Sequence, residues 1–248
     1  RQLRAFLPLF SMFLFASVVA DAVSFRLDAE TGVAFNTINT VRIPGDTGTK
    51  FSITDDLDVD PAFITRIRFG VQITKKQEVS LLLAPLTLYA DGESPAPINF
   101  NGKTFPANEP LDARYQFNSW RLTWRWFFSE RGERWETALG FTAKVRDAAI
   151  EINGGGVHSI NSNIGFVPLL NFYVHYRLGN DWTLLLDGDA LAAPQGRAED
   201  VFIGAMRRVG TDATARAGYR VIEGGADNEI VYTFALLHFV VIGLDVRF

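Results

Sequence analysis

Apolar and polar side chains alternate along nearly all of the chain after residue 22. Within residues 24–37, for example, the apolar Phe25 and Leu27 alternate with Arg26 and Asp28. The same alternation recurs in residues 62–73, 135–145, 170–178, 213–221 and 240–248. Successive side chains of a β-strand point to opposite faces of a sheet, so each of these segments has one apolar and one polar face. The pattern predicts an all-β protein.

The first 22 residues differ from the rest of the chain. A short basic stretch at 1–4 (RQLR) precedes an apolar run at 5–20, and Ala20 and Ala22 lie two positions apart. This order of basic, apolar and small residues is typical of a cleaved secretory signal peptide. The apolar run is shorter than the roughly 20 residues of a membrane-spanning helix, although an N-terminal membrane anchor stays an alternative. We therefore expect a signal peptide over residues 1–22 and one domain over residues 23–248.

The connections between the predicted strands differ systematically in length. Short ones lie at 75–78, 129–134, 179–181 and 210–212, and longer or more irregular ones lie at 39–61, 90–113, 151–162, 193–199 and 223–229. A soluble β-sandwich turns its apolar faces inward. A membrane barrel turns them toward lipid and joins its strands by short turns at one end and longer loops at the other. The alternation favours a transmembrane up-and-down antiparallel β-barrel of about ten strands, with eight as the alternative count.

Aromatic residues cluster near the predicted connections. Trp126, Trp135, Trp182 and Phe248 lie next to the short turns or at the chain end. Amphipathic aromatic side chains favour the membrane–water interface, so these four are expected to form a girdle at the periplasmic side. An outer girdle is expected from the following residues: Tyr89, Tyr115, Phe117 and Tyr232.

The end of the chain carries the most specific signal. Residues 240–248 read VVIGLDVRF, an alternating apolar segment that ends in Phe248. This segment resembles the assembly signal of bacterial outer-membrane proteins, which end in Phe. With the predicted signal peptide and strands, the chain is similar to the small outer-membrane β-barrels that include OmpA-type and OmpX-type domains. The resemblance implies a Gram-negative cell envelope, contact with outer-membrane lipid and insertion by the outer-membrane assembly machinery.

Composition excludes several functions. The absence of cysteine rules out disulfides, thiolate metal sites and a cysteine nucleophile. A formal net charge of -4 argues against a general nucleic-acid binder. Four aspartates crowd residues 55–60, but the segment lacks the Gly and the distal Glu of an EF-hand loop. We therefore expect no cofactor and no metal ion.

The polar face of the predicted strands carries charges of both signs. By strand parity, the barrel interior is lined by Arg26, Asp28, Glu30, Arg66, Arg68, Arg121, Arg125, Glu136, Lys144, Arg146, His175, Arg177, Asp187, Asp189, Arg216, Arg220, Asp245 and Arg247. Such charges are either structural ion pairs that fill the barrel or the lining of a narrow, Arg-rich passage that favours anions. Barrel diameter grows with strand number, and about ten strands lies close to the filled eight-strand case, which favours a plugged interior.

Enzymes built on similar barrels provide a further comparison. Omptin-type proteases use an Asp-x-His element, lipid A deacylases use His-x-Ser, and outer-membrane phospholipases use a related His and Ser pair. None of these elements occurs in this chain. We interpret His158 as a loop residue, His175 as part of the interior ion network and His238 as a residue at the membrane interface. The sequence therefore predicts no catalytic site.

The combined expectation is a monomeric integral outer-membrane β-barrel with a structural, surface-interaction or ligand-binding role. A narrow anion-favouring diffusion channel and a barrel enzyme acting on envelope lipid or peptide are the alternatives. No motif specifies a solute, a ligand or a protein partner.

Overall fold

The computed structural model describes residues 23–130, 132–179, 181–194 and 196–248. The predicted signal peptide at 1–22 lies outside the described residues. The strands are β1 Ser24–Arg42, β2 Phe51–Ser52, β3 Leu57–Val59, β4 Ala62–Thr74, β5 Gln77–Ala84, β6 Thr87–Glu93, β7 Ile98–Phe100, β8 Lys103–Phe105, β9 Pro110–Phe127, β10 Trp135–Gly154, β11 Val157–Gly179, β12 Trp182–Ala193, β13 Gly196–Arg208, β14 Ala213–Asp227 and β15 Tyr232–Arg247. Among these residues, no helix is long and apolar enough to cross a membrane.

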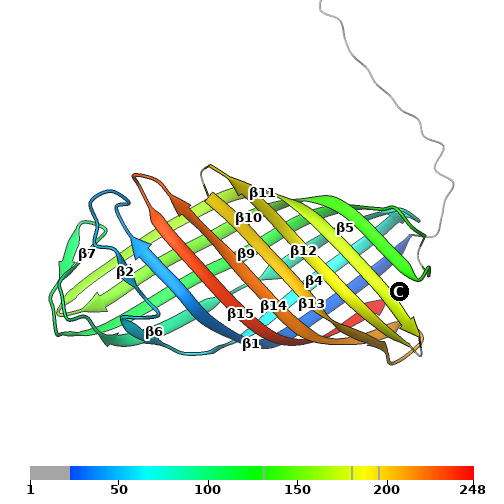
Figure 1. Cartoon of the computed structure of the whole chain (residues 1–248), viewed down its shortest axis with the longest axis horizontal. Coiled ribbons are helices and arrows are strands. Elements are labelled where there is room, and N and C mark those ends of the chain that lie inside the picture. The colour runs from blue at the N-terminus through cyan, green and yellow to red at the C-terminus, as the bar shows by residue number, and fades with distance from the viewer. Residues whose placement is uncertain (1–22, 131, 180, 195) are drawn as a thin grey trace, which may run out of the picture.

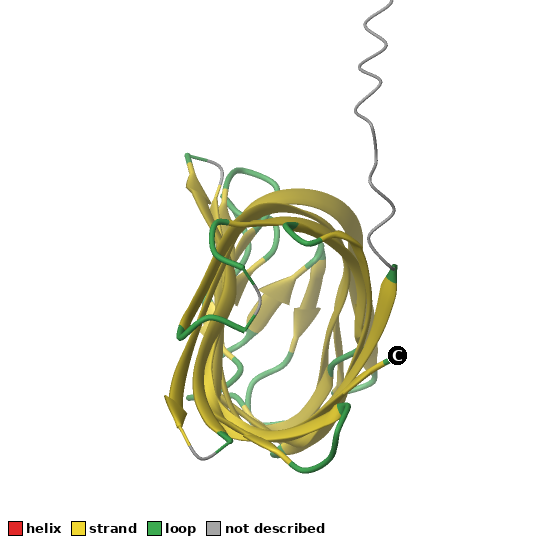
Figure 2. Cartoon of the chain, turned by 90° about the vertical axis from the view of Figure 1, so that its right-hand side faces the viewer, coloured by secondary structure: helices red, strands yellow, loops and turns green. Residues whose placement is uncertain are grey.

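Ten of these strands close into an antiparallel barrel with strongly tilted strands (Figure 1). The order around the barrel is β1, β4, β5, β9, β10, β11, β12, β13, β14 and β15, and β15 pairs with β1 again. Pro85 separates β5 from β6, which continues the same path along β9. The view along the barrel shows the strands as one continuous ring (Figure 2). The prediction of an all-β, ten-stranded, up-and-down barrel is therefore confirmed.

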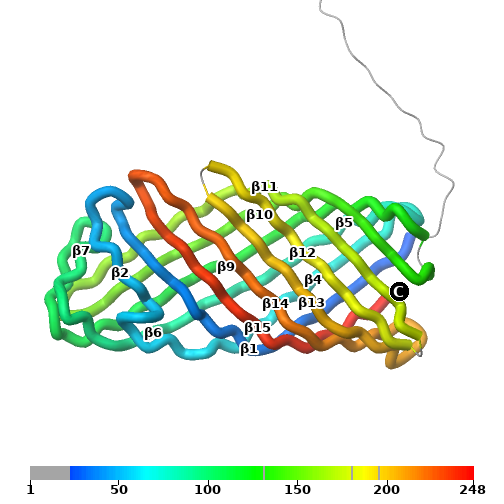
Figure 3. The backbone as a smooth tube through the Cα atoms, in the orientation of Figure 1, coloured from blue at the N-terminus to red at the C-terminus, as the bar shows by residue number. Residues whose placement is uncertain are grey.

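The two ends of the barrel differ in their connections. The short turns lie at the end where Phe248 closes the ring, with its N–H donating to the Phe25 carbonyl at 2.9 Å. The small strands β2 and β3 and the β7–β8 hairpin lie at the opposite end, at the left of Figure 3. We call these the turn end and the loop end.

At the loop end, the strands run further than predicted. β10 continues to Gly154 and β11 starts at Val157, so the loop expected at 151–162 is a two-residue turn. Likewise, most of 193–199 and 223–229 belongs to strands. Gly and Asn weaken an isolated strand, but here a ladder that starts in the membrane-embedded part continues through them, with each strand supported by its neighbour.

The outer surface carries an apolar belt around the middle and the turn end of the barrel. Its exposed members include Phe25, Leu27, Phe63, Ile67, Leu81, Trp120, Leu122, Trp124, Leu139, Phe141, Phe166, Leu170, Leu184, Ile203, Val240 and Ile242. Trp126, Trp135, Trp182 and Phe248 are exposed at the turn end, where a girdle was expected. Exposed apolar side chains of this kind are stable against lipid rather than water.

The predicted outer girdle is only partly correct. Tyr89 is 60% exposed, and Tyr232 lies on the outward parity of β15. Tyr115, however, is buried inside the barrel, and Phe117 packs beside it against the interior core. Side chains alternate along β9, and Trp120 is exposed on the outer surface. The even-numbered positions 114, 116 and 118 therefore also face outward, and the odd-numbered Tyr115 and Phe117 face inward.

Candidate functional site

The interior of the barrel is densely charged. Among the described residues, the buried basic side chains are Arg26, Arg66, Arg68, Arg121, Arg125, Lys144, Arg216 and Arg220, and the buried acidic ones are Asp28, Glu30, Glu78, Glu136, Asp189, Asp200 and Asp245. Asp187 joins them with a side chain 14% exposed. Every one of the ten barrel strands contributes a polar side chain to this set or to its hydrogen bonds. Burying an unpaired charge costs free energy, so the partners of these side chains must be identified first.

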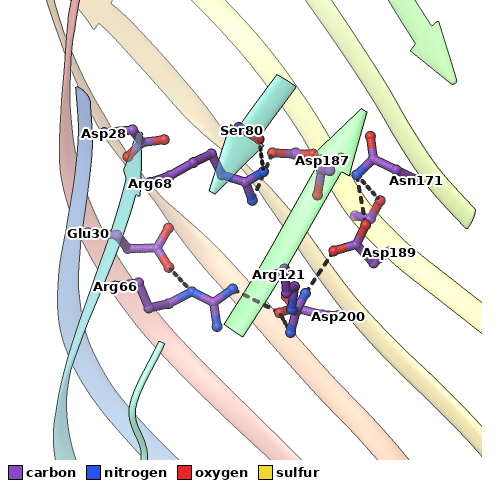
Figure 4. Close-up of polar contacts among 12 residues, drawn as sticks. Asp28, Glu30, Arg66, Arg68, Ser80, Arg121, Asn171, Asp187, Asp189 and Asp200 are labelled. Atoms are coloured by element: carbon purple, nitrogen blue, oxygen red, sulfur yellow. Dashed lines mark hydrogen bonds and ion pairs between the residues drawn. The ribbon is translucent and has the colours of Figure 1, made fainter. Parts of the chain in front are cut away.

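Asp200 on β13 is the centre of this network. Its carboxylate lies 2.8 Å from Arg66 on β4 and 2.7 Å from Arg121 on β9 (Figure 4). It also accepts a hydrogen bond from Arg220 on β14. β4 and β13 are separated by three other strands around the barrel, as are β9 and β13. These ion pairs therefore cross the interior rather than following the wall.

Glu30 on β1 forms a second junction beside Asp200. Its carboxylate pairs with Arg66 at 3.3 Å, with Arg216 at 2.8 Å and with Arg220 at 2.9 Å. Arg66 and Arg220 thus bridge the two acids. The ring of Phe202 lies beneath Arg216 and Arg220, at 5.5 and 5.3 Å from their guanidinium carbons. Aromatic faces attract such cations, so the ring fills space without breaking the network.

Two further aspartates bind the arginines of β9. Asp189 accepts from Arg121 at 2.8 Å and from Thr142 at 2.6 Å. Asp187 accepts from Arg125 at 2.7 Å. Asn171 on β11 joins the two groups, because it accepts from Arg125 and donates to Asp189, both at 2.8 Å (Figure 4).

Toward the turn end, Arg26 gathers three acids. It pairs with Asp28 at 3.3 Å, with Glu78 at 3.6 Å and with Asp245. Asp28 is in turn bonded to Arg216, which connects this group with Glu30. The charged residues therefore form one continuous network rather than a row of free arginines.

Apolar side chains fill the interior on the loop side of this network. We call this group the apolar plug; its buried members include Val41, Ile43, Phe51, Ile53, Leu57, Leu88, Ile98, Phe100, Phe105, Leu111, Ile150, Ile152 and Leu237. It combines inward residues of the long strands with side chains of β2, β3, β7 and β8. The apolar plug was not predicted, because strand parity assigned a polar interior to the whole barrel.

Two small cavities lie in and above the network. One is lined by residues of the plug boundary such as Ile64, Leu86 and Phe117, and the other by network residues such as Asp28 and Arg68. Each has a volume of about 10 Å³. A space of this size holds about one water molecule.

The remaining predicted lining residues lie at the margins of the network. Lys144 is buried with its ammonium 4.7 Å from the Phe117 ring, and Arg146 donates to Asn163 at 2.7 Å. At the turn end, Arg177 donates to Glu136 at 3.0 Å, and His175 lies 3.9 Å from the same carboxylate. Whether any of them contacts a solute stays a prediction.

Asp200 and Glu78 are network members that the sequence reading missed. Asp200 belongs to the strand whose alternation is broken by Arg207 and Arg208, and Glu78 was assigned to a turn. A clean parity count from Phe202, which is buried, places Asp200 inside. The alternation of residues 200 and 202 is visible in the sequence, but assigning it to the interior requires the bounds of β13.

The other two histidines lie on the outer surface near the loop end. His158 is the second residue of β11 rather than a loop residue. It lies 2.9 Å from Glu151, which also pairs with Arg114 at 2.7 Å. The hydrogen bond to His158 and then that to Arg114 hold the pKa of the Glu151 carboxyl below its ordinary value. His238 donates to or accepts from Thr37 at 2.8 Å.

Several solved structures are similar to this chain. The outer-membrane protease OmpT from Escherichia coli matches with a TM-score of 0.54 and 10% identity, over 91% of this chain and 97% of that chain. Ail, the attachment invasion locus protein of Yersinia pestis, matches with a TM-score of 0.40 and 10% identity, over 90% and 99%. OprG from Pseudomonas aeruginosa matches with a TM-score of 0.35 and 9% identity, over 91% and 95%. No protein-family model and no curated protein matches the chain.

At 10% identity, the likeness to OmpT shows the fold alone. Together with the closed barrel and its exposed apolar belt, it defines the class of protein: an integral β-barrel of the bacterial outer membrane.

Proposed function

We propose that this protein is a sealed barrel that holds a rigid, polar extension above the outer membrane for contacts at the cell surface. The observation that carries the proposal is the filled interior. Arg66, Arg121 and Asp200 connect opposite walls of the barrel, and the apolar plug closes the loop side. A solute-conducting role is disfavoured because, within the described residues, the basic side chains of the network are paired with acidic ones.

The strands themselves support a surface role. Beyond Trp120, the outward positions of β9 change from apolar to polar, with Asn118, Gln116 and Arg114 following in turn. Gln116 donates to Asp147 at 3.0 Å, and Asn118 donates to it at 3.1 Å. Paired polar side chains on both strands are suited to water, so the sheet continues above the lipid as a wall that supports the loop end.

Single-channel recording of refolded protein in a planar lipid bilayer tests the sealed interior. We expect no unitary conductance steps from inserted protein, with an open porin as the positive control for the bilayer. Reproducible steps would overturn the proposal and favour a channel. Charge reversal at Arg66, Arg68, Arg121 and Arg125 would then be expected to invert any anion preference.

Surface labelling tests the second half of the proposal. Because the chain has no cysteine, a single introduced thiol is a unique label site. We expect Lys103→Cys, in β8 at the loop end, to react with a membrane-impermeant maleimide on intact cells. Lys76→Cys, at the turn end, serves as the matched control and is expected to react only after the outer membrane is permeabilised. The reverse result would contradict a surface role for the loop end.

A further inference from the structure

Two cations and one aromatic ring meet on the outside of the barrel at the loop end. Arg42 ends β1 and pairs with Tyr232, the first residue of β15. The Arg42 guanidinium carbon lies 5.4 Å from the centre of the Tyr232 ring, and the Lys50 ammonium lies 4.5 Å from it. We call Arg42, Lys50 and Tyr232 the rim patch. Its strands β1, β14 and β15 lie side by side on the face toward the viewer in Figure 3.

The two cations of the rim patch form no ion pair with a described residue, although Asp227 on β14 pairs with Tyr232. Within the described part of the chain, neither Arg42 nor Lys50 has a carboxylate within ion-pair distance, and the Arg42 Nε is buried without a hydrogen-bond partner. Other outward arginines at this end are paired, Arg114 with Glu151 at 2.7 Å and Arg197 with Glu223. Two like charges on one ring repel each other, so an anion bound between them would stabilise the arrangement.

The height of the patch points to a lipid headgroup. Ile38, on the same outward row of β1, is an exposed apolar residue, and Arg42 follows four residues later. Four residues of a strand tilted by about 40° rise roughly 10 Å along the membrane normal. The polar headgroup layer begins directly above the hydrocarbon core, so Arg42 and Lys50 lie at headgroup level.

A polar chain lies directly below, among lipid-facing residues. Thr37 is the extra residue of a β-bulge in β1, between Asn36 and Ile38. Its hydroxyl lies 2.8 Å from the His238 Nε2, and the His238 Nδ1 is hydrogen-bonded to the Tyr219 hydroxyl. The outward row of the same strands includes Phe35 and Val240, which are 43% and 60% exposed.

Polar groups on a lipid-facing surface are unfavourable unless they form hydrogen bonds. The side chains of Thr37, His238 and Tyr219 are hydrogen-bonded to one another and stay exposed on the outer surface. This polar chain lies between the apolar belt and the rim patch, where the acyl chains of a lipid join its headgroup. A bulge re-aims a side chain away from the regular ladder, which here brings Thr37 within reach of His238. The rim patch lies at the level of a lipid headgroup. The hydrogen-bonded Thr37 and His238 lie at the level where the acyl chains join that headgroup.

We propose that the outward face of β14, β15 and β1 binds one phosphorylated glycolipid of the outer leaflet. Arg42 and Lys50 bind a phosphate of its headgroup, with the planar guanidinium donating two hydrogen bonds and the ammonium acting as a point charge. Thr37 and His238 hydrogen-bond a carbonyl or hydroxyl at the junction with the acyl chains. This inference is independent of the proposed surface role.

Native mass spectrometry of the refolded full barrel in detergent tests the site, with bisphosphorylated lipid A as the probe. We expect wild type to retain one lipid and the double variant Arg42→Gln/Lys50→Gln to bind about 30-fold more weakly, because each cation near a membrane surface contributes a factor of about five. Arg207→Gln is the matched control, since its guanidinium lies 5.5 Å from the Trp182 ring at the turn end. We expect it to bind like wild type.

Two further probes distinguish the source of the phosphate. Fully dephosphorylated lipid A is expected to bind wild type and the double variant equally, and inorganic phosphate is expected not to displace the phosphorylated lipid at equimolar concentration. Equal loss in Arg207→Gln would show general charge attraction and overturn the proposal. So would an unchanged double variant, or displacement by equimolar inorganic phosphate.

The polar chain is tested separately by His238→Phe, which keeps a ring but removes both nitrogen atoms. We expect about fivefold weaker binding of both the phosphorylated and the dephosphorylated lipid, the effect of about one hydrogen bond. Unchanged binding of both lipids would remove the acyl junction from the site. If the double variant does not refold, Lys50→Gln alone, at an exposed side chain, replaces it with an expected loss of about fivefold.

Discussion

At the residue scale, a single carboxylate organises the interior. Asp200 receives three arginines from three different strands, and its side chain is almost fully buried. The opposing charges in this network are what make burial of so many arginines possible. Removing one partner leaves the others uncompensated, whereas removing both members of a pair costs much less.

We predict that Asp200→Asn lowers the free energy of unfolding by about 3 kcal/mol or more, because it leaves Arg66, Arg121 and Arg220 with less opposing charge. Urea unfolding of the refolded barrel in lipid vesicles measures the change. Asp60→Asn, at an exposed residue near the loop end, is the control and is expected to change stability by less than about 0.5 kcal/mol. Equal midpoints for the two variants would contradict a central role for Asp200.

At the element scale, the β7–β8 hairpin forms much of the apolar plug. Asn101 and Gly102 form its turn with φ of 50° and 75°, a left-handed conformation that favours Asn-Gly in tight hairpins. Phe100 and Phe105 on either side are fully buried. The Asn101 N–H donates to the Ile43 carbonyl at 2.8 Å, and the Lys103 ammonium donates to the His158 carbonyl at 2.7 Å. Packing and hydrogen bonds thus fix the hairpin to the wall.

We predict that Phe105→Ala accelerates trypsin cleavage after Lys103 by about tenfold or more, since losing a buried ring weakens the packing that keeps the hairpin closed. Time-resolved proteolysis of the refolded protein measures the rate. Phe63→Ala, which removes a ring 89% exposed on the lipid face, is expected to leave the rate unchanged. Equal cleavage of Phe105→Ala and wild type would show that the hairpin does not depend on the plug.

At the scale of the whole molecule, closure joins the first and last strands. β1 and β15 pair over most of their length, and Phe248 adds only two backbone hydrogen bonds to Phe25 with a side chain 69% exposed. The terminal residue therefore contributes little to the closed barrel. The resemblance of residues 240–248 to an assembly signal predicts a role for Phe248 before closure.

We predict that deletion of Phe248 strongly lowers the amount of protein in the outer membrane of living cells, because the resemblance of residues 240–248 to an assembly signal implies that the assembly machinery recognises this residue. Barrel formation from urea into detergent is expected to stay within about twofold of wild type, since only two hydrogen bonds are lost. Membrane fractionation and refolding assays measure the two quantities. Equal amounts of the variant and wild type in the membrane would contradict the assembly role.

The sequence by itself determined the barrel, since side-chain alternation is a local property of each strand. The parity of Arg66, Arg121 and Asp189 follows from their neighbours in the chain, and so does the outward belt. The alternation of short turns and longer loops then predicted the up-and-down order of the strands. The loop boundaries were less accurate, because pairing with a neighbouring strand decides whether Gly and Asn residues are extended.

Only the tertiary structure decided which charged side chains meet across the interior. Arg66 and Asp200 are 134 residues apart, and they meet because strand register and tilt bring β4 and β13 to the same height on opposite walls. Thr37 and His238 lie 201 residues apart and meet because β1 pairs with β15 where the barrel closes. Local periodicity specifies which face a side chain occupies. Its partner across the barrel depends on the shear of the whole closed sheet, which no single segment encodes.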